Sequence, residues 1–191
     1  GKASKDSSFA GWFSLNGNGE MTGTTWIEES GFLSSPVFIT NTHSVGTVRD
    51  SFIQWQVKRD PSFNVWALPV VAETFDGYLN DINANHVTEQ HVVAAIEAAR
   101  PGPVEEGSVG GGTGMNCYHY KGGSGTASRL VDDYSVGVFV QANFGARREL
   151  VLAGVPLGDA LADDDPMLDW DRAAPGSGSV ITTPFYLNAV N

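Results

Sequence analysis

The sequence predicts an α/β fold, in which helices cover a sheet within one domain. Apolar residues recur at helical spacing in some segments, and short β-branched or aromatic runs lie between them. No internal repeat or change of composition divides the chain. Hydrophobic residues make up 41% of the 191 residues and charged residues 17%, as in a globular protein. We therefore expect residues 1–191 to form a single domain.

Helices are expected over residues 24–30, 44–60 and 88–99. Gly31 ends the first, because glycine accepts the left-handed conformation at a helix C-terminus. In the second, Val45, Val48 and Phe52 form an apolar stripe, and Pro61 sets the latest end. Thr88 is the expected N-cap of the third.

Strands are expected over residues 9–15, 36–40, 64–72, 134–142, 149–155 and 180–187. Pro69 indicates a bulge or a strand end inside the third of these segments, because proline cannot donate to a ladder. Residues 143–145 form a turn that pairs 134–142 with 149–155. Residues 159–179 are acidic and rich in Gly, Pro and Ser, which favours a solvated loop.

Charge and hydropathy exclude several classes of partner. The formal net charge is −11, which opposes binding to nucleic acid. No apolar run has the length of a membrane-spanning helix, and no signal peptide is recognisable. We expect a soluble protein of the cytoplasm or periplasm that binds neither nucleic acid nor membrane.

The sequence indicates no cofactor and no metal. The histidines are scattered, without the i, i+4 spacing of zinc hydrolases; they are His43, His86, His91 and His119. Cys117 and His119 alternate as strand neighbours on one face, so a thiol nucleophile is one interpretation and a small buried residue is the other.

Two segments, residues 106–115 and 121–129, are dense in glycine. Such density is typical of backbone that turns tightly or approaches another group closely. A phosphate-binding loop would need Lys and Ser or Thr after its last glycine, whereas Met115 follows Gly114. No Gly-x-Ser-x-Gly nucleophile elbow is present either. The glycine-rich segments therefore match neither a phosphate-binding loop nor a nucleophile elbow.

Polar residues at predicted strand ends are the remaining candidates. Glu73 and Asp76 follow an apolar strand and Asp81 comes soon after, so they either present a charge to a ligand or cap a turn. Asn143 follows another apolar run, where it is either a turn residue or an amide donor to a developing oxyanion.

Seven motifs in register resemble the self-processing aminopeptidases, the family of L-aminopeptidase/D-amidase-esterases and β-peptidyl aminopeptidases. The resemblance extends from Phe9 to about Leu157. Its motifs lie at residues 15–19, 40–46, 68–74, 79–81, 106–115, 121–129 and 138–145. It implies a four-layer αββα sandwich, similar to N-terminal-nucleophile hydrolases but with different connectivity. It also implies a precursor that cleaves itself before a serine, which becomes the N-terminal nucleophile of a β subunit with its own amine as base.

The resemblance implies roles for particular residues. Asn143 matches the amide of the oxyanion hole, and Glu73 matches the carboxylate that meets the free amine of the substrate. Phe75 stands where some members carry an active-site tyrosine. Gly111 and Gly112 are expected to let the main chain approach the substrate. Ser124 replaces a residue that is usually aliphatic.

The resemblance also implies that this chain is the α subunit of a processed αβ enzyme, without some tens of residues of the family's N-terminal part. We expect scission after Asn191, because an Asn–Ser bond fits such processing; Ser179 in an uncleaved segment is the alternative nucleophile. The expected partners are the β subunit, a short peptide or amino-acid amide, and further copies in a tetramer of αβ pairs. Two functions remain open: an aminopeptidase, or a non-catalytic ligand-binding homologue with the same fold.

Overall fold

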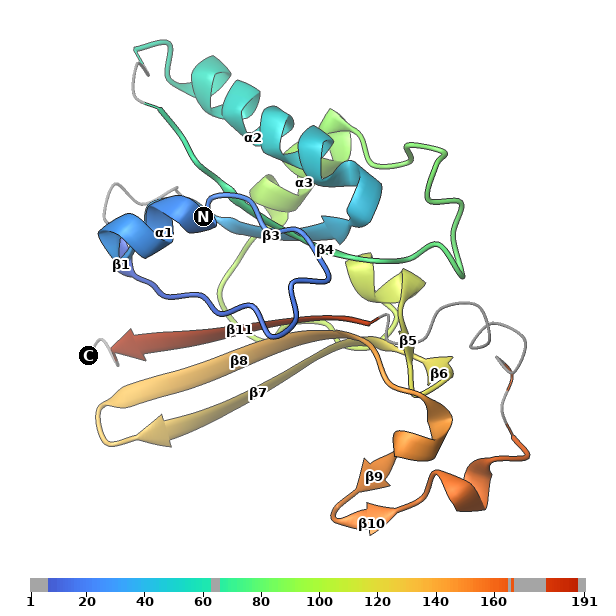
Figure 1. Ribbon diagram of the computed structural model, residues 1–191. Helices are drawn as coiled ribbons and strands as arrows, with labels where there is room; N and C mark the ends of the chain where they lie inside the picture. Colours follow the sequence, from blue (N-terminus) through green and yellow to red (C-terminus); the bar gives the residue numbers. More distant parts are fainter. Residues whose placement is uncertain (1–6, 63–65, 165, 167–177, 189–191) are drawn as a thin grey trace. The chain divides into compact units, whose positions relative to one another are not determined.

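The computed structural model describes residues 7–62, 66–164, 166 and 178–188, drawn in colour in Figure 1. The chain divides into two compact units. One comprises Gly1–Glu73 with Asp81–Pro103, and the other Thr74–Asn80 with Val104–Asn191. Helices and strands are mixed, as the α/β class requires. The single domain and the four-layer arrangement stay predictions.

The three expected helices are present in the first unit. They are α1 (Thr24–Ser30), α2 (Val45–Arg59) and α3 (Glu89–Ala98). Gly31 ends α1 with φ 73°, and its N–H donates to Ile27 O at 2.8 Å. Thr88 precedes α3, and its N–H donates to Nδ1 of His91 at 3.1 Å. His91 is therefore a helix-capping residue.

Two strands of the first unit are shorter than predicted, whereas the strand expected over 36–40 is present at Val37–Asn41. β3 (Val37–Asn41) pairs with β4 (Val70–Thr74), and β1 (Ser8–Phe9) pairs with β2 (Phe32–Leu33). The prediction of strand over 66–69 was wrong: β4 begins after Pro69, which has no N–H to donate. Residues 63–65 lie outside the described part. The prediction over 10–15 was also wrong, since none of these residues lies in a strand, and Phe13 and Leu15 are exposed.

The core of the first unit lies between α2, α3 and β4. Its buried members are Val45, Val48, Phe52, Val71, Val92 and Ile96. The ring of Phe52 lies 5.4 Å from that of Phe38 and 6.1 Å from that of Trp55, measured between centroids. The helical stripe read from the sequence is therefore the face that α2 buries.

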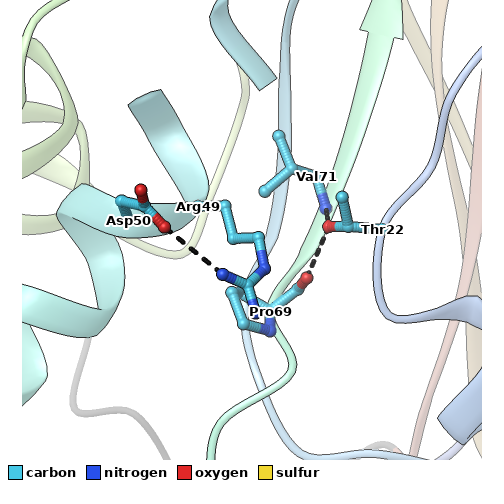
Figure 2. Close-up of polar contacts among 5 residues, drawn as sticks. All are labelled: Thr22, Arg49, Asp50, Pro69 and Val71. Atoms are coloured by element: carbon cyan, nitrogen blue, oxygen red, sulfur yellow. Dashed lines mark hydrogen bonds and ion pairs between the residues drawn. The ribbon is translucent and has the colours of Figure 1, made fainter. Parts of the chain in front are cut away.

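A segment before α1 runs along β4 and extends its pairing. Thr22 N–H donates to Val71 O at 3.0 Å, and Met21 pairs antiparallel with Ala72. The Thr22 hydroxyl donates to Pro69 O at 2.7 Å and accepts from Val71 N–H at 3.0 Å (Figure 2). Figure 2 also shows the Arg49–Asp50 ion pair of 3.3 Å, which contributes little because water screens it.

The second unit contains a three-stranded antiparallel sheet in the order β11-β8-β7 (Figure 1). Its strands are β7 (Gly123–Val131), β8 (Tyr134–Asn143) and β11 (Ser179–Asn188). Strands over 134–142 and 180–187 are thus confirmed. The predicted pairing of 134–142 with 149–155 was wrong. A tight turn with Asp132 at φ 52° pairs β8 with the glycine-rich β7 instead.

Smaller elements complete the second unit. Hairpins form between β5 (Asn116–Cys117) and β6 (Tyr120–Lys121), and between β9 (Val151–Leu152) and β10 (Val155–Pro156). Short 3₁₀ helices cover Gly110–Gly114, Arg147–Glu149 and Asp159–Leu161, with a further one at Thr42–Ser44 in the first unit. Among the described residues, no helix is long and apolar enough to cross a membrane.

We predict that Phe52→Ala lowers the free energy of unfolding by about 3–5 kcal/mol, because it leaves a cavity in the core of α2 and β4. Chemical denaturation followed by circular dichroism measures the loss. Val57→Ala is the control, since this residue of α2 is 46% exposed and should change stability by about 0.5 kcal/mol or less. Equal losses for both variants would contradict the assignment of the core.

Candidate functional site

Asn143 is the last residue of the central strand β8, and both ends of its side-chain amide are held. Oδ1 accepts from Asn116 N–H at 3.0 Å, and Nδ2 donates to Phe75 O at 2.9 Å. These partners distinguish the oxygen from the nitrogen and fix the plane of the amide. A primary amide carries two N–H groups, and among the described residues only Phe75 accepts from this one.

Phe75 therefore contributes through its main chain, which orients Asn143. Its ring is 41% exposed and carries no hydroxyl, so the side chain makes no conventional hydrogen bond. The expectation that Phe75 binds substrate stays a prediction.

Gln141 lies two residues before Asn143, and the sequence reasoning missed it. Its side chain is buried, and Nε2 donates to the Thr74 hydroxyl at 2.5 Å. Gly111 packs on the same amide: an alanine Cβ there would lie 2.5 Å from Gln141 Oε1. The only sequence signal was a glutamine that directly follows an apolar run. Gln141 thus links Thr74 to the glycine-rich turn.

The turn at Gly110–Gly114 is glycine-rich for packing reasons. A Cβ at Gly112 would lie 2.5 Å from Gly107 O and 2.8 Å from Ser124 N. Those two atoms belong to the bridge in which Gly107 and Ser124 exchange backbone hydrogen bonds of 2.7 and 3.0 Å. No side chain fits at Gly112, whatever it faces on the other side. The substrate-binding roles of Gly111 and Gly112 stay predictions.

Lys121 fastens this turn to the β5–β6 hairpin. Its Nζ donates to Gly112 O at 2.7 Å, Gly122 O at 2.8 Å and Met115 O at 3.2 Å. Partial burial lowers the pKa of its ammonium group. Lys121 also borders an open depression of about 380 Å³, lined by residues of β7 and β8 together with Gly107, Cys117 and Gly122. No phosphate role is needed to explain this lysine.

Glu73 lies in β4 of the first unit and is 4% exposed. Its Oε2 accepts from the Thr42 hydroxyl at 2.5 Å. Its backbone N–H donates to Glu20 O at 3.2 Å, and Gly19 lies against its Oε1. The sequence reasoning identified Glu73 but missed Thr42 and Gly19. Both belong to motifs, 40–46 and 15–19, that it had singled out only for their resemblance.

The other carboxylates of this region are turn residues. Asp76 Oδ2 accepts from Asn80 Nδ2 at 2.7 Å, and Asp76 O accepts from the N–H groups of Leu79 and Asn80. Asp81 Oδ1 accepts from Asn83 N–H at 3.1 Å. The turn interpretation therefore accounts for both aspartates.

Cys117 and His119 are not strand neighbours, so that expectation was wrong. Tyr118 and His119 have φ of 53° and 61° and form the tight turn between β5 and β6. Arg147 covers the turn: its guanidinium lies 3.1 Å from the Tyr120 ring centroid and donates to His119 O at 3.3 Å. Burial raises the pKa of the Cys117 thiol, partly offset by a hydrogen bond from the Phe144 backbone. A raised pKa opposes the nucleophile interpretation.

Within the described ranges, no three His, Cys, Asp or Glu side chains gather as a metal site would require. Asn191 lies outside the described residues. Ser179 begins β11, and its Cα is paired with that of Asn143 in the antiparallel register.

Comparison with known proteins decides the family. The sequence profile of Peptidase family S58 matches residues 1–184. This chain belongs to peptidase family S58. The family resemblance read from the seven motifs is thereby confirmed.

Relatives of this S58 chain include enzymes of known structure. Beta-peptidyl aminopeptidase BapA of Sphingosinicella microcystinivorans is 49% identical over 196 residues, which cover 95% of this chain and 49% of the relative. A Burkholderia sp. beta-aminopeptidase superimposes with a TM-score of 0.83 at 47% identity, covering 96% of this chain and 51% of that one.

The L-aminopeptidase D-Ala-esterase/amidase of Ochrobactrum anthropi superimposes with a TM-score of 0.84 at 44% identity, covering 93% of this chain and 49% of that one. That enzyme is described as a prototype of the serine aminopeptidases and a new variant of the Ntn hydrolase fold. This S58 chain spans about half the length of these relatives.

We predict that Cys117 of the folded S58 chain reacts at least about tenfold more slowly with iodoacetamide at pH 8 than in guanidinium chloride. The thiolate is the reactive form, and a raised pKa leaves less of it at a given pH. The rate should therefore rise at a higher pH than for free cysteine. Mass spectrometry of the alkylated protein measures both rates; equally rapid labelling of the folded chain would contradict the prediction.

Proposed function

We propose that the protein containing this chain is an aminopeptidase. It hydrolyses the amide bond after a free N-terminal amino acid in short peptides, amino-acid amides or esters. Membership of family S58 and the aminopeptidase names of its relatives support this activity. The single observation that carries the proposal is the amide of Asn143, oriented by Asn116 N–H and Phe75 O at the end of β8.

The proposed nucleophile is a serine that self-processing exposes at the N-terminus of a companion β subunit, with the residues before it in the precursor as the α subunit. Of the two positions considered, the strand register favours Ser179, because it is the Cα partner of Asn143 across β8 and β11. A four-layer αββα sandwich and a tetramer of αβ pairs remain part of this proposal.

The proposed reaction follows from these groups. The serine Oγ attacks the substrate carbonyl carbon while its proton passes to the free amine of the same residue. The carbonyl oxygen becomes an oxyanion, to which the remaining N–H of Asn143 donates. The tetrahedral intermediate collapses to an ester on the serine, and the leaving amine takes the proton. Water then hydrolyses the ester. Glu73 accepts hydrogen bonds from the substrate ammonium and thereby selects a free N-terminus.

We predict that Asn143→Asp lowers kcat about 10²–10³-fold on an L-amino-acid or β-alanyl nitroanilide, because the oxyanion loses its donor. The aspartate keeps an acceptor for Asn116 N–H, which limits structural damage. Steady-state kinetics measures the effect, and thermal denaturation verifies folding. Val151→Ala is the control, since this side chain is exposed on the β9–β10 hairpin. A folded Asn143→Asp variant with unchanged kcat would contradict the oxyanion role.

We also predict that Ser179→Ala leaves the precursor uncleaved, whereas wild type yields two chains. Mass spectrometry of the intact products measures the scission position, and the new N-terminus should be Ser179. A new N-terminus after Asn191, with cleavage retained in Ser179→Ala, would show that the favoured position is wrong. A wild type that neither cleaves itself nor hydrolyses free-amine amides would point to a non-catalytic ligand-binding homologue.

A further inference from the structure

We propose that Gly19 and Thr42 shape the ammonium-binding site at Glu73. Thr42 occupies one carboxylate oxygen, and the missing side chain of Gly19 keeps the other open to a primary ammonium group. This inference rests on the proposed function, because it specifies how the substrate amine is held. All its residues belong to the first unit.

Backbone pairing brings Gly19 to Glu73. Thr22 N–H donates to Val71 O, Met21 pairs antiparallel with Ala72, and Glu73 N–H donates to Glu20 O. The Thr22 hydroxyl adds bonds to both Pro69 O and Val71 N–H, and so fixes this register (Figure 2). The residue next to this ladder is Gly19, which therefore lies beside Glu73.

Thr42 fixes the carboxylate from the other side. It begins the 3₁₀ helix Thr42–Ser44 directly after β3, the strand that pairs with β4. Its hydroxyl donates to Glu73 Oε2 at 2.5 Å, a short bond of the kind that a charged acceptor makes. One oxygen of this buried carboxylate is thus satisfied by the protein itself.

The second oxygen is left for a ligand. No described residue donates a hydrogen bond to Glu73 Oε1. An alanine Cβ at position 19 would lie 2.7 Å from Oε1, which is the distance of a charge-assisted hydrogen bond from an ammonium nitrogen. Glycine at this position therefore avoids that contact and leaves this side of Oε1 uncovered by a side chain. Glu73 as a residue is 4% exposed, so a cation that reaches Oε1 meets a carboxylate that is largely shielded from water.

The hydrogen-bonding chemistry of Oε1 defines the ligand class. A primary ammonium brings N–H donors within hydrogen-bond distance of Oε1, whereas an N-acylated amine is neutral and an N,N,N-trimethylated one has no N–H. The site therefore favours cationic amines that keep N–H donors over acylated or fully methylated ones. The net charge of −11 favours the approach of cationic substrates in general. It does not account for the discrimination among amines at Glu73.

Gly19→Ala tests the inference. Only atoms of Glu73 lie within 4 Å of the added Cβ, and the φ of Gly19 is not in the left-handed region, so the fold should tolerate the methyl group. We expect KM for a free-amine aminoacyl nitroanilide to rise about tenfold or more, with a smaller change in kcat. The inhibition constant of ethylammonium chloride should rise in parallel. Gly11→Ala is the matched control, since nothing lies within 4 Å of a Cβ there.

Thr42→Val and Thr42→Ser provide an independent test. Valine removes the donor to Oε2 and should raise KM, whereas serine keeps a hydroxyl and should restore it to near the wild-type value. If thermal denaturation shows that Gly19→Ala is unstable, the KM values of the two Thr42 variants test the inference instead.

The outcomes separate the two proposals. A wild type without activity on free-amine amides overturns the proposed function. An active wild type, with folded Gly19→Ala and Thr42→Val variants that retain its KM and its inhibition by ethylammonium, overturns the present inference alone.

Discussion

Glu73, Thr74 and Gln141 are 4%, 0% and 2% exposed, although each carries a polar side chain. Each of these groups needs a hydrogen-bond partner, because leaving a buried polar group unpaired costs more free energy than a typical hydrogen bond contributes. Thr42 serves Glu73 in the first unit, and Gln141 serves Thr74 in the second. The hydrogen bonds that stabilise these buried groups in the fold therefore also fix the positions of the candidate site residues. Fixed donors and acceptors of this kind are what catalysis requires, since they pay no reorganisation during the reaction.

The glycine-rich segments acquire a physical meaning in this structure. Gly111 and Gly112 touch the Gln141 amide and the Gly107–Ser124 bridge so closely that a Cβ has no room. Lys121 then ties the turn to the β5–β6 hairpin through three carbonyl oxygens. Asn116 of that hairpin donates to Asn143. The turn, the β5–β6 hairpin and the Asn143 amide are thus held together by successive contacts. Asn143 is the residue proposed to stabilise the oxyanion.

The central position of β8 depends on chain segments that are distant in sequence. β7 comes directly before β8, whereas β11 begins at Ser179, 36 positions after Asn143 (179 − 143), and Ser179 is the Cα partner of Asn143. The expected partner over 149–155 instead forms part of the small β9–β10 hairpin. Its apolar pattern fitted either arrangement, because strand pairing is decided by register and turn geometry rather than by composition. The Asp132 turn, with its left-handed φ, settles the choice for β7.

By itself, the sequence determined the three helices with their Gly31 and Thr88 boundaries, the α/β class and the family, because helical periodicity, capping and ordered motifs are local signals. It also identified Glu73 and Asn143, through the resemblance. Only the tertiary structure revealed Thr42 and Gly19 beside Glu73, and the bond from Gln141 to Thr74. It alone also revealed the turn that separates Cys117 from His119 and the partners of β8. These depend on contacts between residues far apart in the chain, and no local pattern specifies which distant groups a buried side chain will meet.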